Sequence, residues 1–336
     1  MKTVRTQDAI GMPLAHDVTQ IIPGKFKGAR FKKGHIVAEE DVPVLLSIGK
    51  ENLYVLELTE EDVHEDEAGL RIATAAAGAN IQLKVKGEGK VELAADCRGI
   101  LRVDEQKLLD LIDDDEVMFA TIHGNQLVER GQVVAGTRVI PLYVKETTVV
   151  RAEKVTDIIY VDPMRSAKVG IVTTGSEIYN GLITDKFGDV LRKKFAALDC
   201  TVMDQLFSDD DEQMIADCIH KLVDQGADFI AVTGGMSVDP DDRTPAGIRQ
   251  AGTKIITYGA PVLPGAMFLL GYLGNIPVVG LPGCVMYHGS SIFELVVPRL
   301  LAGERISRRD IKRLGHGGMC RNCAVCTYPN CGFGKG

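Results

Sequence analysis

The richest group of chemically active residues lies between residues 228 and 245. It begins with an apolar run, Phe229–Val232, which predicts a buried strand. A tight turn and a set of acids follow, made of Gly234, Gly235, Ser237, Asp239, Asp241, Asp242, Thr244 and Pro245. A Thr before a Pro favours the start of a helix, so the sequence predicts a strand, a glycine loop and a helix N-terminus. Such a turn directs amide N–H groups at an anion, and the acids could hold a Mg²⁺ ion that binds the same anion.

A second chemical motif is the cysteine series Cys320, Cys323, Cys326 and Cys331, spaced C-x2-C-x2-C-x4-C. Four thiols in so short a segment predict a bound metal rather than packing, with disorder or transient disulfides as the alternatives. The spacing resembles iron–sulfur ligation, although its last gap is one residue longer than in the bacterial ferredoxin run, and a four-cysteine zinc site fits as well. The other cysteines are isolated and are expected to be reduced packing residues: Cys97, Cys200, Cys218 and Cys284.

Regular alternation of strand and helix patterns begins at Lys168. Strands are expected at residues 168–173, 201–207, 228–233, 254–257, 267–270 and 276–281. Helices are expected at residues 185–198, 209–225 (capped by Ser208 or Asp209), 245–251 and 286–301. The pattern predicts an α/β fold with a doubly wound, mostly parallel sheet, preceded by α+β and β-rich N-terminal domains.

Ligands of such sheets bind at the carboxyl edge of the strands. Three loops are predicted to reach that edge, at residues 173–177, 234–245 and 281–284. The first two carry hydroxyls and acids beside glycines, and the third carries a Pro-Gly turn. A glycine after one strand is common, but three such loops in the same context predict one ligand site.

Five short motifs mark these loops and the segment between them: Thr-Gly-Ser-Glu at 174–177, Thr-Gly-Gly-Met-Ser at 233–237, Asp-Arg-Thr-Pro at 242–245, Pro-Gly at 264–265 and Leu-Pro-Gly at 281–283. With them, residues 168–303 resemble the molybdopterin-binding domain shared by molybdenum insertases (the gephyrin-like proteins), molybdopterin adenylyltransferases and competence-damage proteins. Residues 31–36 and 41–49 resemble the N-terminal arrangement of the insertases, whereas the four-cysteine tail is an addition to the insertase pattern. The ligand that the resemblance implies is molybdopterin or its adenylylated form.

The resemblance implies roles for individual residues, as phosphate ligands in the first loop and as pterin contacts in the others. Glu177 and Asp242 would be the catalytic acids, near Mg²⁺ or bound molybdate. The residues implied to bind the cofactor are Thr173, Thr174, Gly175, Ser176, Asp185, Gly234, Gly235, Met236, Ser237, Asp241, Thr244, Pro264, Gly265, Pro282, Gly283 and Cys284. Asp185 has a plainer alternative, because an Asp at the start of a helix is favourable without any ligand.

The reaction that the resemblance implies is Mg²⁺-dependent insertion of molybdate into molybdopterin, a transferase step of molybdenum cofactor biosynthesis. Insertases carry lysines around their Pro-Gly turn, whereas Leu263–Met267 has none, and their later Pro-Gly-Asn-Pro motif is replaced at 282–285. The alternative is a non-catalytic carrier, chaperone or sensor that delivers the cofactor to a client molybdoenzyme. The missing lysines favour the carrier, and the retained acids favour the enzyme. The insertase relatives also suggest a homodimer.

Changes in pattern along the 336 residues predict four parts. They are a small mixed α/β unit at 1–58, an α+β middle domain at 59–165, the molybdopterin-binding domain at 166–303 and a basic cysteine tail at 304–336. The tail carries seven Lys or Arg against two acids, which fits either a solvated tail or a surface for an anionic ligand or an acidic partner. Because the α/β domain completes its sheet before the tail begins, we expect the tail to lie outside the core of that domain.

Composition argues against two classes of partner. The formal net charge of −8 disfavours a general nucleic-acid binder. Residues 255–291 lack Asp, Glu, Lys and Arg, but Pro and Gly divide them into pieces too short to cross a bilayer. The first ten residues carry scattered charges and no apolar core, so no signal peptide is predicted. We therefore expect a cytoplasmic protein with no nucleic-acid or membrane partner.

Overall fold

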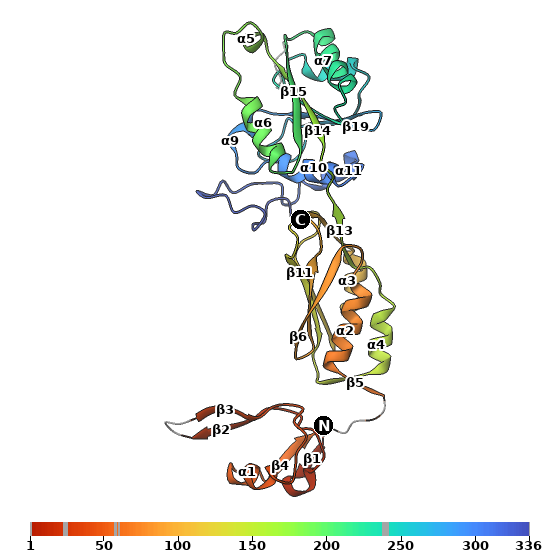
Figure 1. Cartoon of the computed structure of the whole chain (residues 1–336), viewed down its shortest axis with the longest axis vertical. Helices are drawn as coiled ribbons and strands as arrows, with labels where there is room; N and C mark the ends of the chain where they lie inside the picture. Colours follow the sequence, from red (N-terminus) through yellow and green to blue (C-terminus); the bar gives the residue numbers. More distant parts are fainter. Residues whose placement is uncertain (1, 23–25, 57–58, 60, 237–241, 336) are drawn as a thin grey trace. The chain divides into compact units, whose positions relative to one another are not determined.

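The computed structural model describes residues 2–22, 26–56, 59, 61–236 and 242–335 (Figure 1). The chain divides into two compact units. The first unit is made of residues 1–95, 104–122 and 131–160, and the second of residues 96–103, 123–130 and 161–336. The four sequence-based boundaries stay predictions.

The N-terminal part of the first unit is built from short antiparallel strand pairs. Strand β1 (Lys2–Arg5) pairs with β4 (Asn52–Val55), and β2 (Val18–Ile22) pairs with β3 (Phe26–Phe31). A short 3-10 helix, η1 (Thr6–Ala9), and the helix α1 (Asp41–Ser47) complete it. The apolar side chains that form its own small core are Ala9, Leu14, Val18, Phe31, Val37, Leu45, Leu53 and Val55.

The rest of the first unit is a four-stranded antiparallel sheet with helices on one face (Figure 1). In sheet order its strands are β6 (Ile81–Gly87), β7 (Lys90–Ala95), β11 (Val133–Val139) and β9 (Val117–Thr121). The remaining elements are the paired β5 (Asp62–His64) and β12 (Tyr143–Lys145) and the helices α2 (Glu65–Ala76), α3 (Glu105–Ile112) and α4 (Glu146–Glu153). Arg71 of α2 donates hydrogen bonds to Glu146 and Glu153, which joins α2 to α4.

The second unit is organised by a six-stranded sheet in the order β15-β14-β16-β19-β18-β17. Its strands are β14 (Lys168–Thr174), β15 (Thr201–Ser208), β16 (Phe229–Thr233), β17 (Lys254–Tyr258), β18 (Leu269–Leu273) and β19 (Ile276–Leu281). Pairing is parallel from β15 to β19 and antiparallel for β18 and β17. The predicted α/β class with a mostly parallel sheet and a β-rich region before it is therefore confirmed. A three-stranded sheet, β10-β8-β13, adds β8 (Gly99–Val103), β10 (Leu127–Val128) and β13 (Ile159–Pro163).

The helices of this unit follow from their amphipathic patterns and caps. They are α5 (Ser176–Tyr179), α6 (Phe187–Ala196), α7 (Glu212–Asp224), α8 (Thr244–Gln250), α9 (Cys284–Tyr287), α10 (Ile292–Leu301) and α11 (Arg308–Arg313). Helix α7 buries Ile215, Ile219 and Leu222 against the sheet. Its cap is Asp211, whose carboxylate accepts from the Met214 amide, rather than Ser208 or Asp209 as predicted.

The helix predicted at 286–301 is in fact two helices, α9 and α10. Ser291 forms a capping box at the start of α10, because its hydroxyl accepts from the Phe293 amide while Glu294 accepts from the Ser291 amide. This cap and the preceding residues 288–290 interrupt the helical pattern that the apolar residues alone would continue.

The tail belongs to the core of the second unit, so the expectation that it lies outside is wrong. Ile306, Ile311 and Phe333 are buried members of the apolar cluster that also contains Phe195 and Phe293. A single aromatic residue between two glycines shows no periodicity, so the sequence pattern did not reveal its burial. The tail therefore helps to stabilise the α/β unit.

None of the helices in the described ranges has both the length and the apolar character needed to cross a bilayer.

Replacing Phe333 by Ala should destabilise the protein, because a phenyl ring that is only 4% exposed would leave a cavity. The expected loss is about 3–5 kcal/mol, measured as a lower urea midpoint of the full chain by circular dichroism. Met319→Ala is the control, since Met319 is 75% exposed in the same tail and its loss should change the free energy of unfolding by less than about 0.5 kcal/mol. Equal midpoints for the two variants would contradict the packing described here.

Candidate functional site

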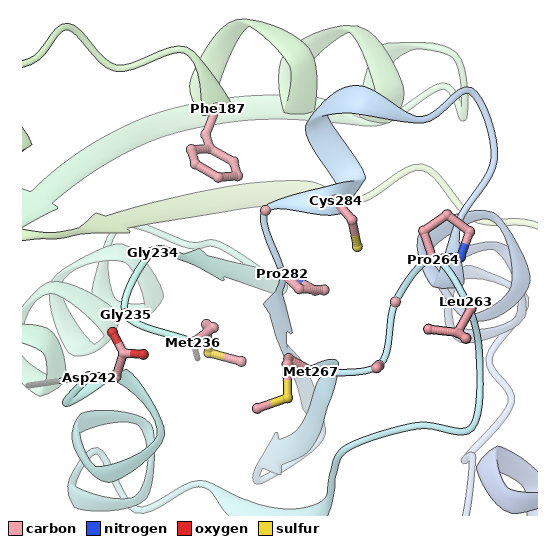
Figure 2. Close-up of a pocket in the computed structure, with 13 residues that line it drawn as sticks. Phe187, Gly234, Gly235, Met236, Asp242, Leu263, Pro264, Met267, Pro282 and Cys284 are labelled. Carbon is pink, nitrogen blue, oxygen red and sulfur yellow. The ribbon is translucent and has the colours of Figure 1, made fainter. Parts of the chain in front are cut away.

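Loops after β16 and β19, together with the segment before β18, enclose an open cavity of about 600 Å³ at the carboxyl edge of the sheet (Figure 2). The residues that line it are Phe187, Gly234, Gly235, Met236, Asp242, Leu263, Pro264, Gly265, Ala266, Met267, Pro282, Gly283 and Cys284. The structure thus brings together the predicted residues of the third loop and of the Pro264-Gly265 turn with four of the second loop, Gly234, Gly235, Met236 and Asp242, whereas Thr244 does not line the cavity. The predicted residues of the first loop do not line this cavity.

The turn after β16 depends on its two glycines. Gly234 and Gly235 have φ angles of +90° and +50°. A Cβ added at Gly234 would lie 2.1 Å from the Thr174 carbonyl oxygen, and one at Gly235 would lie 2.6 Å from Thr244 Oγ1. The turn therefore packs directly on the end of β14. Beneath it, the buried hydroxyls of Thr174 and Thr244 lie 2.8 Å apart and link β14 to α8.

The loop after β14 binds carboxylates of its own chain. The Ser176 amide and hydroxyl donate to Asp210 Oδ2 at 2.9 and 3.0 Å, and the hydroxyl also donates to Asp209 Oδ1 at 2.5 Å. The Ser176 hydroxyl, together with the Asp210 amide, lowers the pKa of Asp209. Of the residues predicted to hold phosphate, Ser176 is thus engaged by two acids that were not among the predicted site residues. Their position directly after β15, at the same sheet edge, was the signal that could have identified them.

Asp185 makes the helix-start contacts that its plainer alternative predicts, and its role toward the cofactor stays a prediction. Its carboxylate accepts from the amides of Phe187 and Gly188 at 2.8 and 3.0 Å, at the start of α6. It also accepts from Gln205 Nε2 at 2.7 Å, and the same amide nitrogen donates to Thr173 Oγ1 at 2.9 Å. Asp185 lines a second hollow of about 430 Å³, separate in its lining residues from the first. Glu177 is exposed and lines neither hollow.

The far wall of the cavity is held by α10. Gly265 has a φ of +136°, and a Cβ there would lie 2.5 Å from Ile292 Cβ. The Ile292 amide donates to the Pro264 carbonyl at 3.1 Å, so the Pro-Gly turn is fixed to the first residue of α10. On the opposite loop, Pro282 is buried, and Cys284 begins α9. Burial raises the pKa of the Cys284 thiol, which is therefore protonated near neutral pH.

Asp242 is the one carboxylate among the described residues that line the cavity. Figure 2 shows it beside Met236, across the cavity from Leu263 and Pro264. Tyr258 lies nearby, since its hydroxyl donates to the Met236 carbonyl at 3.3 Å. Burial, with a further contribution from the Asp242 charge, raises the pKa of Tyr258. The described lining contains no Lys, Arg or His. Three other predicted or candidate residues, Ser237, Asp239 and Asp241, lie outside the described residues.

The tail cysteines are close to the sheet unit but are not gathered around one point. Cys320 and Cys331 are partly buried against the core of the second unit, whereas Cys323 and Cys326 are exposed. Within the described chain, no group of three or more His, Cys, Asp and Glu side chains is placed to hold a metal ion. The Mg²⁺ site and the iron–sulfur or zinc site therefore remain predictions.

Comparison with known proteins supports the ligand class. Residues 170–302 match a family described as "Probable molybdopterin binding domain", and residues 3–57 match a "Domain of unknown function (DUF8806)". A search of curated proteins finds no match to the chain. Residues 170–302 of the second unit therefore match the molybdopterin-binding family, and the insertase type in particular stays a prediction.

Similar solved structures include two cofactor biosynthesis proteins. The molybdopterin biosynthesis enzyme MoaB of Thermus thermophilus is 22% identical, with 41% of this chain and 98% of that chain covered and a TM-score of 0.33. The tungsten cofactor synthesizing protein MoaB of Pyrococcus furiosus is 18% identical, with coverages of 42% and 99% and a TM-score of 0.35. The protein CinA of Thermoplasma acidophilum, a protein of unknown function, is 16% identical, with coverages of 35% and 89% and a TM-score of 0.32.

Gly234→Ala should disrupt the turn that forms one wall of the cavity, because the new methyl would overlap the Thr174 carbonyl. Gly181→Ala is a matched control, since Gly181 also has a positive φ but nothing within 4 Å of an added Cβ. The control should cost about 1 kcal/mol from backbone strain alone, and Gly234→Ala clearly more, as measured by urea unfolding. A Gly234→Ala variant no less stable than the control would refute the close approach.

Proposed function

We propose that the cavity binds molybdopterin or its adenylylated form and that the protein acts in molybdenum cofactor biosynthesis. The observation that carries this proposal is the position of the cavity: it lies at the carboxyl edge of the sheet, inside the segment that matches the molybdopterin-binding family. Ligands of open α/β sheets bind at this edge. The lining is mostly backbone, proline and apolar side chains, which suits a flat heterocycle better than a highly charged ligand alone.

The two ends of the ligand would be held differently. The thioethers of Met236 and Met267 offer polarisable contacts to a pterin ring. The anionic end has no cation among the described lining residues, so its charge would be balanced by amide N–H groups and by Mg²⁺. Mg²⁺ commonly binds through one or two carboxylates together with substrate phosphates, and Asp242 supplies one such carboxylate. The described residues fit Mg²⁺ only in that shared form, in which the ion would neutralise the phosphate charge.

Two functions are compatible with this ligand, one catalytic and one not. Mg²⁺-dependent insertion of molybdate, with Asp242 as the acid near the metal, is favoured by the carboxylate that faces the cavity. A carrier, chaperone or sensor that delivers the cofactor to a client molybdoenzyme, alone or as a homodimer, is favoured by the cation-free described lining. Molybdate is an oxyanion, and a catalyst that binds it would ordinarily offer it a positive charge.

Purified protein should be given adenylylated molybdopterin, Mg²⁺ and molybdate, and AMP release should be followed over time. An insertase releases AMP only when molybdate and Mg²⁺ are both present, and this is the expected result if Asp242 acts in catalysis. Tight binding of the ligand without AMP release would instead assign the carrier role. If the protein neither binds the ligand nor releases AMP, the proposed ligand class is overturned.

Asp242→Asn should weaken Mg²⁺-dependent ligand binding by about tenfold or more, because an amide is a poor Mg²⁺ ligand and carries no charge. Binding without Mg²⁺ should change little, and AMP release, where present, should be lost. The control is Asp224→Asn, an exposed acid at the end of α7. If Asp242 serves only to support the start of α8, the Asn variant would bind as the native protein does, since Asn and Asp cap helices about equally well.

A further inference from the structure

The cysteine tail is joined to the rim of the cavity by backbone hydrogen bonds. The Leu263 amide donates to the Gly318 carbonyl, and the Cys320 amide donates to the Leu263 carbonyl, both at 2.8 Å. Leu263 and Met319 thereby form a parallel bridge. Leu263 itself lines the cavity. The first cysteine of the series is therefore bonded directly to a residue of the rim, which we define as Leu263–Gly265.

Two of the four thiols converge on one hydroxyl just before α10. Cys320 Sγ and Cys326 Sγ lie 3.9 and 3.7 Å from Ser290 Oγ. Cys331 packs against the same apolar cluster as Cys320. Two thiols of the series therefore share one contact and a third packs on the core of the same unit, while Cys323 is exposed between them in sequence.

The segment that carries the remaining thiol is free to adjust. Residues 321–326 are described, belong to no helix or strand, and take part in no backbone–backbone hydrogen bond. Moving Cys323 and Cys326 inward would therefore break no secondary structure. The cost of ordering six residues is one that metal–thiolate bonds readily exceed in small metal modules.

We propose that Cys320, Cys323, Cys326 and Cys331 bind one thiolate-ligated metal centre, a zinc ion or an iron–sulfur cluster, and that this centre holds the rim of the cavity in place. The thiols would release their protons on binding, so no oxidant or reductant is required for a zinc ion or a preassembled cluster. The centre would sit beside the cavity rather than in it, since none of the four cysteines lines the cavity.

The rim is bonded to the tail at Leu263 and to the first residue of α10 at Pro264. At one end Leu263 bonds Gly318 and Cys320, and at the other the Pro264 carbonyl accepts from the Ile292 amide. Ser290, which contacts two of the thiols, lies two residues before Ile292. A metal that fixes these thiols would hold Leu263 directly and would act on Pro264 through Ser290 and the start of α10, whatever anion the cavity takes. The inference therefore does not depend on the proposed function.

The first test is metal content in protein purified without oxygen. Native protein should contain either one zinc per chain by elemental analysis or iron with visible thiolate-to-iron absorption. Cys323→Ser should lose most of that metal, because one of the four proposed ligands is removed. The Cys323 thiol is exposed, so its loss should not disturb the packing of the core. Cys97→Ser, an isolated cysteine outside the series, should keep it. Metal-free native protein, or full metal content in Cys323→Ser, would overturn the proposal.

The second test asks whether the metal holds the rim. Amide hydrogen exchange at Leu263 and Cys320 should be at least about tenfold faster in Cys323→Ser than in native protein, because the hydrogen bonds of both amides depend on the docked tail. Cys97→Ser should match the native rates. Cys323 is distant in sequence from Leu263 and forms no hydrogen bond with it among the described residues, so a purely local role would leave the Leu263 rate unchanged. Unchanged rates in a metal-depleted variant would refute the link between the metal and the rim.

Discussion

The close approach of the Gly234–Gly235 turn to the end of β14 is the constraint on which the cavity depends. The parallel register pairs Thr173 with Thr233, so β14 and β16 end within one residue of each other and their loops begin at the same edge of the sheet. A residue with a Cβ at position 234 would be forced away from the Thr174 carbonyl. Because glycine allows the contact, the start of the loop after β16 packs on the end of β14. Met236 and Asp242 of this loop then line the cavity.

The βα alternation of the second unit could be predicted because its signals are local. A strand buried on both faces reads as a short apolar run, and an amphipathic helix such as α7 shows its buried face in the spacing of its apolar residues. The break between α9 and α10 was missed because apolar residues continue across it, and only the Ser291 capping box interrupts them. Burial of Phe333 was missed for the opposite reason, since one aromatic residue in a glycine-rich segment has no pattern. The first miss concerns a local signal, because Ser291-Ile-Phe-Glu294 fits the capping-box pattern, whereas the second concerns a tertiary contact that no window of sequence contains.

The predicted site residues lie together at one cavity where backbone turns place them, and they lie apart from it where side chains of the same chain compete for their donors. Glycine and proline turns at 234–235, 264–265 and 282–283 all reach the cavity, and the first and third do so because they directly follow the ends of β16 and β19. The loop at 174–176 was expected to present its donors to phosphate, yet Ser176 binds Asp209 and Asp210. Such partners come from a neighbouring strand and become visible only once the sheet order is known. A phosphate at this loop would have to displace two carboxylates or arrive with a cation that binds them.

The N-terminus of α10 is the element at which the cavity and the tail meet. Ile292 packs against Gly265 and bonds the Pro264 carbonyl, while Tyr328 of the tail donates to the Glu294 carbonyl one turn into the helix. Ser290 contacts tail thiols immediately before the cap. The first turn of α10 is thus contacted by the rim of the cavity and by the tail. Close-packed contacts such as that between Gly265 and Ile292 leave no space for the helix to move relative to only one of the two. Any change in how the tail is held therefore acts on the cavity wall through α10, even though the tail cysteines do not line the cavity.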